Sequence, residues 1–97
     1  MTLTNSTLSN NQASNGGGIY NASTLNLTGS TLTGNSAPNG SAIYNTRSVT
    51  MTSGTLSNNV NSGIFNSATG TVTFTGSTLS GSTASGIKNS GVLFLTN

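Results

Sequence analysis

The sequence repeats itself about every two dozen residues, and this repeat limits the folds that the chain can adopt. Four segments align along their length, MTLTNSTLSNNQASNGGGIYN, LNLTGSTLTGNSAPNGSAIYN, VTMTSGTLSNNVNSGIFN and VTFTGSTLSGSTASGIKN, and a fifth begins as VLFLTN. A short internal period of this kind is typical of solenoids, in which each unit contacts only its neighbours. The unit starts are spaced by 24, 24, 23 and 20 residues and fall at Met1, Leu25, Val49, Val72 and Val92.

Each unit contains three short segments separated by turns rich in Asn, Gly and Ser. Apolar and polar residues alternate in the first segment, as in Val49-Thr50-Met51-Thr52, which is the pattern of a strand with one buried face. We therefore expect equivalent apolar side chains to stack in buried columns from unit to unit. The predicted core columns are Leu8, Leu32, Leu56 and Leu79; Ile19, Ile43, Ile64 and Ile87; and Leu27, Met51 and Phe74.

A single unit cannot bury its apolar column alone, whereas stacked units pair each strand with its equivalent one turn away. The sequence therefore predicts an all-β fold, a right-handed parallel β-helix of about four coils, with 20–24 residues and three short strands per coil. We expect residues 1–97 to form a single β-helix repeat domain. Because no segment of the sequence is recognisable as a cap, we also expect a fragment of a longer array, with neighbouring coils of that chain as partners.

The composition excludes most kinds of site chemistry. The chain contains two cationic side chains, Arg47 and Lys88, and no Asp, Glu, His or Cys. Acid–base pairs, catalytic triads, zinc sites and calcium-binding repeats all depend on the missing residue types. We therefore expect that the protein is not an enzyme and that it holds neither a cofactor nor a metal ion.

The net charge of +2 is too small for a phosphate-binding surface, so we expect no nucleic-acid partner. No apolar run approaches the roughly 18 residues of a membrane span. The first ten residues, MTLTNSTLSN, also lack the basic and apolar regions of a signal peptide.

Asparagines recur at two positions of the unit. Stacked amides can hydrogen-bond along the axis of a cross-β stack, so we interpret the first set as a structural ladder rather than as amides that recognise a sugar. We assign the second set to turns, because Asn tolerates unusual backbone angles there. The predicted ladder is Asn21, Asn45, Asn66 and Asn89, and the predicted turn set is Asn11, Asn35 and Asn59.

Aromatic residues form a third column. Tyr20, Tyr44 and Phe65 each follow an inward Ile, so they point outward, and Lys88 occupies the same position in the fourth unit. Such a stripe could hold a carbohydrate ring or a partner protein, with Lys88 over Phe65. We favour the simpler interpretation that these side chains pack against one another on the outside of the sheet.

Outward Thr and Ser residues form two regular arrays, with expected spacings of about 6.7 Å along a strand and about 4.8 Å between strands. A flat array of this kind is similar to the ice-binding faces of β-helical antifreeze proteins. Thr is also the residue that a polar strand face prefers, and the Ser and Asn interruptions favour that interpretation. The arrays are Thr7/Ser9, Thr31/Thr33, Thr55/Ser57 and Thr78/Ser80, and Thr2/Thr4, Asn26/Thr28, Thr50/Thr52 and Thr73/Thr75.

Two short motifs carry a family resemblance. Gly17-Gly18-Ile19 and Leu8-Ser9-Asn10-Asn11 resemble the paired GGA[I/L] and FxxN motifs of polymorphic outer-membrane protein repeats, with Leu in place of Phe. The glycine motif is reduced to Ser41-Ala42-Ile43 in the second unit. More broadly, the chain is similar to β-helix repeats of bacterial adhesins, autotransporter passengers and secreted proteins of the pectin-lyase-like class.

This resemblance implies an extracellular or cell-surface location, with a host surface protein or a carbohydrate as partner. The leading hypothesis is therefore a non-catalytic structural or surface-display segment of an adhesin-like protein. Two alternatives stay open. One is an ice-binding protein that uses the outward Thr columns, and the other is a non-catalytic fragment of a carbohydrate-active β-helix enzyme.

Overall fold

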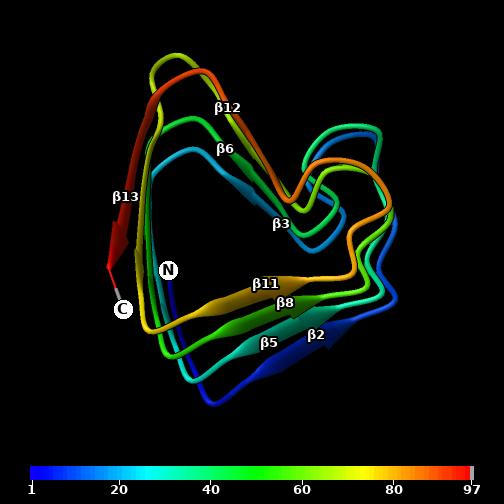
Figure 1. Ribbon diagram of the computed structural model, residues 1–97, viewed down its shortest axis with the longest axis horizontal. Helices are drawn as coiled ribbons and strands as arrows, with labels where there is room; N and C mark the ends of the chain where they lie inside the picture. The colour runs from blue at the N-terminus through cyan, green and yellow to red at the C-terminus, as the bar shows by residue number, and fades with distance from the viewer. Residues whose placement is uncertain (97) are drawn as a thin grey trace.

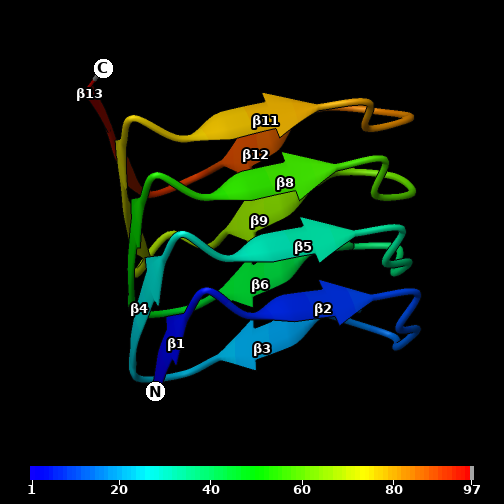
Figure 2. The same ribbon diagram turned by 90° about the horizontal axis from the view of Figure 1, so that it is seen from below.

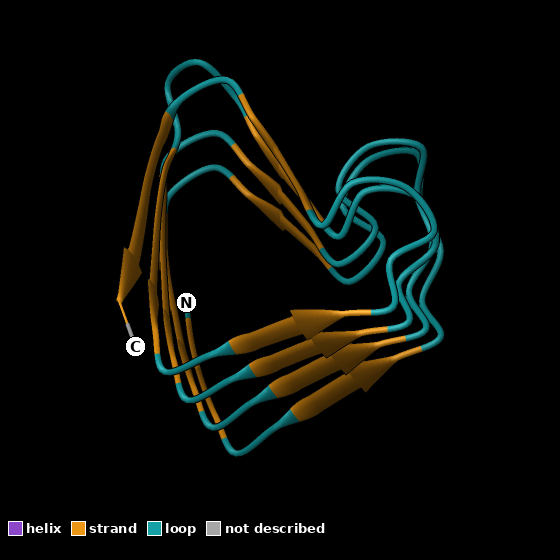
Figure 3. Ribbon diagram, in the orientation of Figure 1, coloured by secondary structure: helices purple, strands orange, loops and turns teal. Residues whose placement is uncertain are grey.

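The computed structural model describes residues 1–96, which form β-strands joined by loops (Figure 3). The chain winds through three strands per coil and encloses a triangular interior (Figure 1). Seen from the side, the coils lie one above another, with β2 and β3 near the N-terminal end and β11 and β12 near the other end (Figure 2). The predicted all-β solenoid with about four turns is confirmed.

Equivalent strands from successive coils form three parallel sheets. The first sheet has five strands, β1 (Thr2–Thr4), β4 (Thr24–Thr28), β7 (Ser48–Thr52), β10 (Thr71–Thr75) and β13 (Val92–Thr96). The second has four, β2 (Thr7–Ser9), β5 (Thr31–Thr33), β8 (Thr55–Ser57) and β11 (Thr78–Ser80). The third also has four, β3 (Ile19–Asn21), β6 (Ile43–Asn45), β9 (Ile64–Asn66) and β12 (Ile87–Asn89).

The register of the strands follows the sequence repeat except at the start of the last unit. Leu25 pairs with Val49, and Val49 pairs with Val72, as the repeat predicts. Val92, however, pairs with Thr71, and Leu93 takes the position opposite Val72. The prediction that Val92 starts the fifth unit is therefore wrong by one residue. The run Val-Leu-Phe-Leu is apolar at every position, so it contains no alternation that could distinguish the inward face from the outward one.

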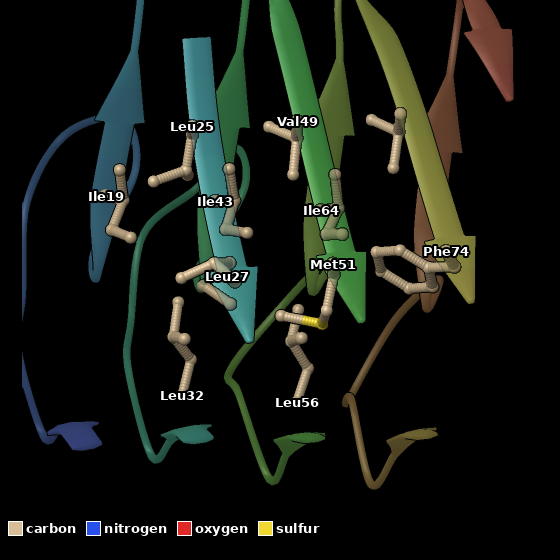
Figure 4. Close-up of a cluster of buried hydrophobic side chains, with 12 residues drawn as sticks. Ile19, Leu25, Leu27, Leu32, Ile43, Val49, Met51, Leu56, Ile64 and Phe74 are labelled. Atoms are coloured by element: carbon tan, nitrogen blue, oxygen red, sulfur yellow. The ribbon is translucent and has the colours of Figure 1, made fainter. Parts of the chain in front are cut away.

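The predicted core columns line the interior of the stack (Figure 4). Leu32 and Ile43 are fully buried in the second coil, and Leu56 and Ile64 are fully buried in the third. The columns end in partly buried side chains, because a terminal coil has a neighbour on one side only. These partly buried members are Leu8, Leu79 and Ile87, together with Leu3 and Leu93.

The residue that directly follows the second strand of each coil lies in a turn with a left-handed backbone conformation. Asn10, Gly34, Asn58 and Gly81 occupy equivalent positions, and all have positive φ, between 53° and 67°. Asn and Gly are the residues that adopt this conformation most readily. They alternate from coil to coil, because a Cβ atom at Gly34 or Gly81 would overlap the Oδ1 atom of the Asn in the preceding coil. The alternation is thus a packing requirement between neighbouring coils.

Candidate functional site

The first asparagine column forms a continuous amide ladder through the stack. Nδ2 of Asn21 donates to Oδ1 of Asn45 at 2.8 Å, Asn45 donates to Asn66 at 2.8 Å, and Asn66 donates to Asn89 at 2.7 Å. Asn45 and Asn66 are fully buried, whereas Asn89 in the fourth coil is exposed. The predicted asparagine ladder is confirmed, with every donor amide directed toward the C-terminal end.

Backbone groups complete the hydrogen bonding of each ladder amide. Nδ2 of Asn45 also lies 3.2 Å from the carbonyl oxygens of Arg47 and Thr71, and Oδ1 accepts from Arg47 N at 3.2 Å. The amide thereby ties the turn after β6 to the next coil. The hydrogen bonds of this buried amide compensate the free energy of its desolvation. If its partners are removed, the desolvation cost remains and destabilises the fold.

The second asparagine set forms another buried ladder, and its assignment to unusual turn conformations is wrong. Nδ2 and backbone N of Asn35 donate to Oδ1 of Asn59 at 3.2 and 2.9 Å, and Asn11 donates to Asn35 in the same way. Asn35 and Asn59 are fully buried. The positive φ angle belongs to the preceding residue of each turn, such as Asn10, so that the following amide is free to point inward.

The second ladder stops at Ser82, which takes the place of Asn in the fourth coil. The Ser82 side chain is too short to continue the ladder, and its buried Oγ has no hydrogen-bond partner among residues 1–96. A cavity of about 210 Å³ adjoins it, lined by Leu79, Ser80, Gly81, Ser82, Ala84 and Gly86. This coil therefore has both a missing amide and unfilled space beside it.

We expect Ser82→Asn to stabilise the protein. Oδ1 of the introduced asparagine would accept a hydrogen bond from Asn59, just as Oδ1 of Asn59 accepts one from Asn35. The larger side chain would also extend into the adjoining cavity. One restored buried hydrogen-bond pair is worth about 1 kcal/mol, which corresponds to a rise in Tm of about 4–8 °C for a chain of this size. Thermal unfolding followed by circular dichroism measures the shift. Ser9→Asn on the outward face of β2, away from this cavity, is the matched control and should leave Tm unchanged. An equal rise in both variants would contradict the role of the ladder.

The aromatic column lies outside the third sheet, as predicted. The rings of Tyr20 and Tyr44 stack with centroids 5.0 Å apart and an interplanar angle of 6°, and those of Tyr44 and Phe65 stack at 4.8 Å and 11°. Nζ of Lys88 lies 5.7 Å from the centroid of Phe65, within cation–π range. Since the ring faces contact one another, the stripe presents mainly ring edges to the outside. This geometry favours mutual packing over a platform for sugar rings.

The outward threonines form two uninterrupted columns, one on each side of the corner where the first sheet meets the second. Parallel register aligns equivalent residues at each position, and the Ser and Asn interruptions fall outside these two columns. The result is a regular surface of hydroxyl and methyl groups without charge. The first column is Thr4, Thr28, Thr52, Thr75 and Thr96, and the second is Thr7, Thr31, Thr55 and Thr78.

Within residues 1–96, no group of acidic, His or Cys side chains is arranged to hold a metal ion. The same part of the chain contains no helix long and apolar enough to cross a membrane.

These features define the chain as a parallel β-solenoid whose interior is held together by apolar columns and two amide ladders. Residues 1–94 match the family model described as "Right handed beta helix region", and the chain belongs to this family. The match also supports the right-handed winding that the sequence predicts. No curated protein and no solved structure matches the chain.

Proposed function

We propose that this chain is a non-catalytic scaffold segment of a secreted or cell-surface protein, in which stacked coils display their outward side chains to partners. The observation that carries the proposal is the use of the buried polar groups. The side-chain amides of Asn35, Asn45, Asn59 and Asn66 are engaged in ladders within the stack. Such groups maintain the spacing of the coils, so recognition is left to side chains on the outward faces.

The resemblance of the repeat motifs to surface proteins supports an adhesive or stalk role. An adhesive segment needs a rigid surface that holds its shape while its outward residues and turns vary. Here the turn between the second and third strands spans 11 residues from Leu32 to Ile43 but 8 residues from Leu56 to Ile64. Both coils nevertheless keep their strands in register, so the turn accepts changes in length that the sheets do not.

The proposal predicts that this turn accepts an inserted peptide. A short epitope tag placed between Pro38 and Asn39 should lower the free energy of unfolding by less than about 1 kcal/mol, because lengthening a surface loop has a small entropic cost. The tag should bind its antibody on the folded protein. The same tag between Leu32 and Thr33 would interrupt β5 and should abolish the folded state. Similar loss of stability at both positions would contradict a display turn.

Attachment and hydrolysis assays separate a scaffold from an enzyme. Beads coated with the chain are tested for attachment to immobilised polysaccharides and to cell-surface proteins, and the same polysaccharides are assayed for released sugar. We expect attachment without release of sugar. Release of sugar would overturn the scaffold assignment, and absence of attachment to every surface would overturn the adhesive role.

The unbroken Thr columns favour ice binding as a second candidate function. Their regular spacing suits the ordering of water at an ice surface, and their lack of charge makes them unsuited to binding a charged partner. We would then expect thermal hysteresis from the purified chain, and Thr52→Lys should remove most of it because Thr52 lies in the middle of the first column. Tyr44→Lys, on another face, is the control. Absence of hysteresis in the unsubstituted chain would exclude this function.

A further inference from the structure

The turn between the second and third strands becomes shorter in the middle of the stack. In the second and third coils it is bounded by two pairs of equivalent residues, Ser36 with Val60 and Ile43 with Ile64. Six residues, 37–42, lie between these positions in the second coil, but only three, 61–63, lie between them in the third. Three residues of the second coil therefore have no equivalent in the third.

Hydrogen bonds between the coils identify these three residues. Nδ2 of Asn61 in the third coil donates to Ala37 O at 3.0 Å, and Ser41 N donates to Ser62 O at 2.7 Å. The residues between Ala37 and Ser41 are Pro38, Asn39 and Gly40. Within residues 1–96, no hydrogen bond joins these three residues to the third coil.

The difference leaves one main-chain N–H group without a protein partner. In the first coil, the N–H group of Gly16 donates to Asn39 O at 3.1 Å. The N–H group of Gly40, one coil later, has no hydrogen-bond partner among residues 1–96. Main-chain N–H groups without a protein partner are normally bonded to water. Hydroxide can therefore reach the N–H group of Gly40, whereas that of Gly16 is held by its partner.

Both glycines directly follow an asparagine. The sequence contains this pair twice, at Asn15-Gly16 and at Asn39-Gly40. The main-chain nitrogen after an asparagine can attack the side-chain amide, and glycine hinders this approach least because it has no Cβ atom. The two pairs thus have the same local chemistry and differ in the hydrogen bonding of the attacking nitrogen.

We propose that Asn39 is a site of spontaneous modification, at which the side-chain amide of the folded protein is converted to a carboxylate, and that Asn15 is protected. The Gly40 nitrogen loses its proton to hydroxide and attacks Cγ of Asn39. The bond between Cγ and Nδ2 breaks, and Nδ2 takes up a proton from water and leaves as ammonia, which closes a succinimide ring. Water then opens the ring at one of its two carbonyl carbons and gives aspartate or isoaspartate. The reaction consumes water and releases ammonia, without oxidation or reduction.

The Asn39 side chain is held weakly enough to reach the attacking nitrogen. Among residues 1–96, its Nδ2 atom makes one hydrogen bond, to Oδ1 of Asn15 at 3.3 Å in an exposed part of the turn. Nδ2 of the fully buried Asn45, in contrast, makes three hydrogen bonds within the ladder. A single long bond in contact with water opens readily, so it does not fix the side chain.

Exposure alone predicts the opposite order of reaction. Asn15 is exposed and Asn39 is only partly exposed, so access of water to the side chain would favour Asn15. The bond from Gly16 N to Asn39 O lies between the first and second coils, so it does not depend on what precedes the first coil. The relative rates at the two asparagines therefore show whether hydrogen bonding or exposure controls the reaction.

The modification would introduce an acidic side chain into a chain that has none. The sequence contains no Asp or Glu and has a net charge of +2, and an aspartate in water is ionised at neutral pH. An aged molecule would thus present a negative charge on this turn, where a newly made one presents a neutral amide. The reaction needs only the chain and water, so it stands or fails separately from the display role.

The test follows conversion at both asparagines in the full chain. The folded protein is incubated in mildly alkaline water labelled with heavy oxygen, so that each new carboxylate carries the label. Chymotrypsin then cleaves after Tyr20, which places Asn15 and Asn39 in separate peptides for mass spectrometry. We expect conversion at least about tenfold faster at Asn39, because Gly16 can react only when its hydrogen bond opens. In urea the two sites should convert at similar rates.

Three results would overturn the proposal. They are equal conversion of the two asparagines in the folded protein, faster conversion at Asn15, and conversion of Asn39 only after unfolding. The products test the mechanism separately. Isoaspartate at position 39 is expected because it forms only through the ring, whereas aspartate alone would mean direct hydrolysis of the amide and would exclude attack by Gly40.

A lengthened third coil tests the physical cause. Insertion of Pro-Ser-Gly between Asn61 and Ser62 gives the third coil a turn as long as that of the second and places a carbonyl group opposite the N–H group of Gly40. Conversion at Asn39 should then fall at least about tenfold, because the attacking nitrogen acquires a partner. Circular dichroism verifies that the variant is folded. Unchanged conversion in the folded variant would contradict the proposed cause.

The matched control is the same insertion between Ala84 and Ser85. It lengthens the equivalent turn of the fourth coil and leaves the third coil unchanged, so conversion at Asn39 should proceed as in the unaltered chain. An equal decrease with both insertions would mean that longer turns protect Asn39 without pairing to Gly40, and would overturn the proposed cause.

Discussion

Leu32→Asp should leave the protein unfolded at 25 °C. Leu32 is fully buried between equivalent leucines of the neighbouring coils, so an aspartate there has neither water nor a cation to compensate its charge. Burying an unpaired carboxylate costs several kcal/mol, in addition to the loss of a buried leucine, and a domain of this size has a total stability of about 5–15 kcal/mol. Far-ultraviolet circular dichroism measures the loss of β-structure.

Thr31→Asp provides the matched control for this substitution. Thr31 precedes Leu32 on β5 but points outward and is only partly buried, so the same charge would remain hydrated. We expect a change in the free energy of unfolding within about 1 kcal/mol. Retention of β-structure and of the original Tm in Leu32→Asp would refute the inward assignment of the leucine column.

Asn45→Ala should destabilise the protein by about 2–4 kcal/mol, even though it removes only one polar side chain. The substitution leaves the Asn21 amide without its acceptor at 2.8 Å and the Asn66 Oδ1 without its donor, and it removes the side-chain donor to the Thr71 carbonyl. Each buried group deprived of its partner costs about 1–3 kcal/mol. Urea unfolding measures the change in the free energy of unfolding.

The control for the ladder is Asn39→Ala. Nδ2 of Asn39 donates to Oδ1 of Asn15 at 3.3 Å in an exposed part of the turn, where water can replace the bond. We expect a change below about 0.5 kcal/mol. Equal effects of the two substitutions would mean that the buried ladder contributes no more than an exposed amide pair.

The sequence was sufficient to predict the parts of this fold in which position and chemistry agree. Leucine and isoleucine recur at fixed intervals and have only one favourable environment, so the columns of Leu32 and Ile43 could be placed inside without a structure. Asn45 was predictable as a ladder member because it follows Ile43 by two residues on the same strand, and so faces the same way.

Residues with two plausible environments could not be placed from the sequence. Asn35 and Asn59 follow a turn rather than a strand residue, where alternation no longer indicates direction, and Asn is equally suited to a turn and to a buried ladder. Their recurrence three residues after Leu32 and Leu56 was the available signal. The predicted register of Val92 was wrong because both faces of its strand are apolar, so the sequence contains no alternation that indicates which face is buried.

The alternation of Asn10, Gly34, Asn58 and Gly81 restricts how such an array can be lengthened or shortened, because an Asn at this position requires a Gly in the next coil. Deleting residues 25–48 would place Asn10 against Asn58, with two side chains where the packing accommodates one. Deleting residues 25–71 would place Asn10 against Gly81 and preserve the alternation. Gene duplications or engineered libraries that insert paired coils should therefore yield folded proteins more often than those that insert single coils.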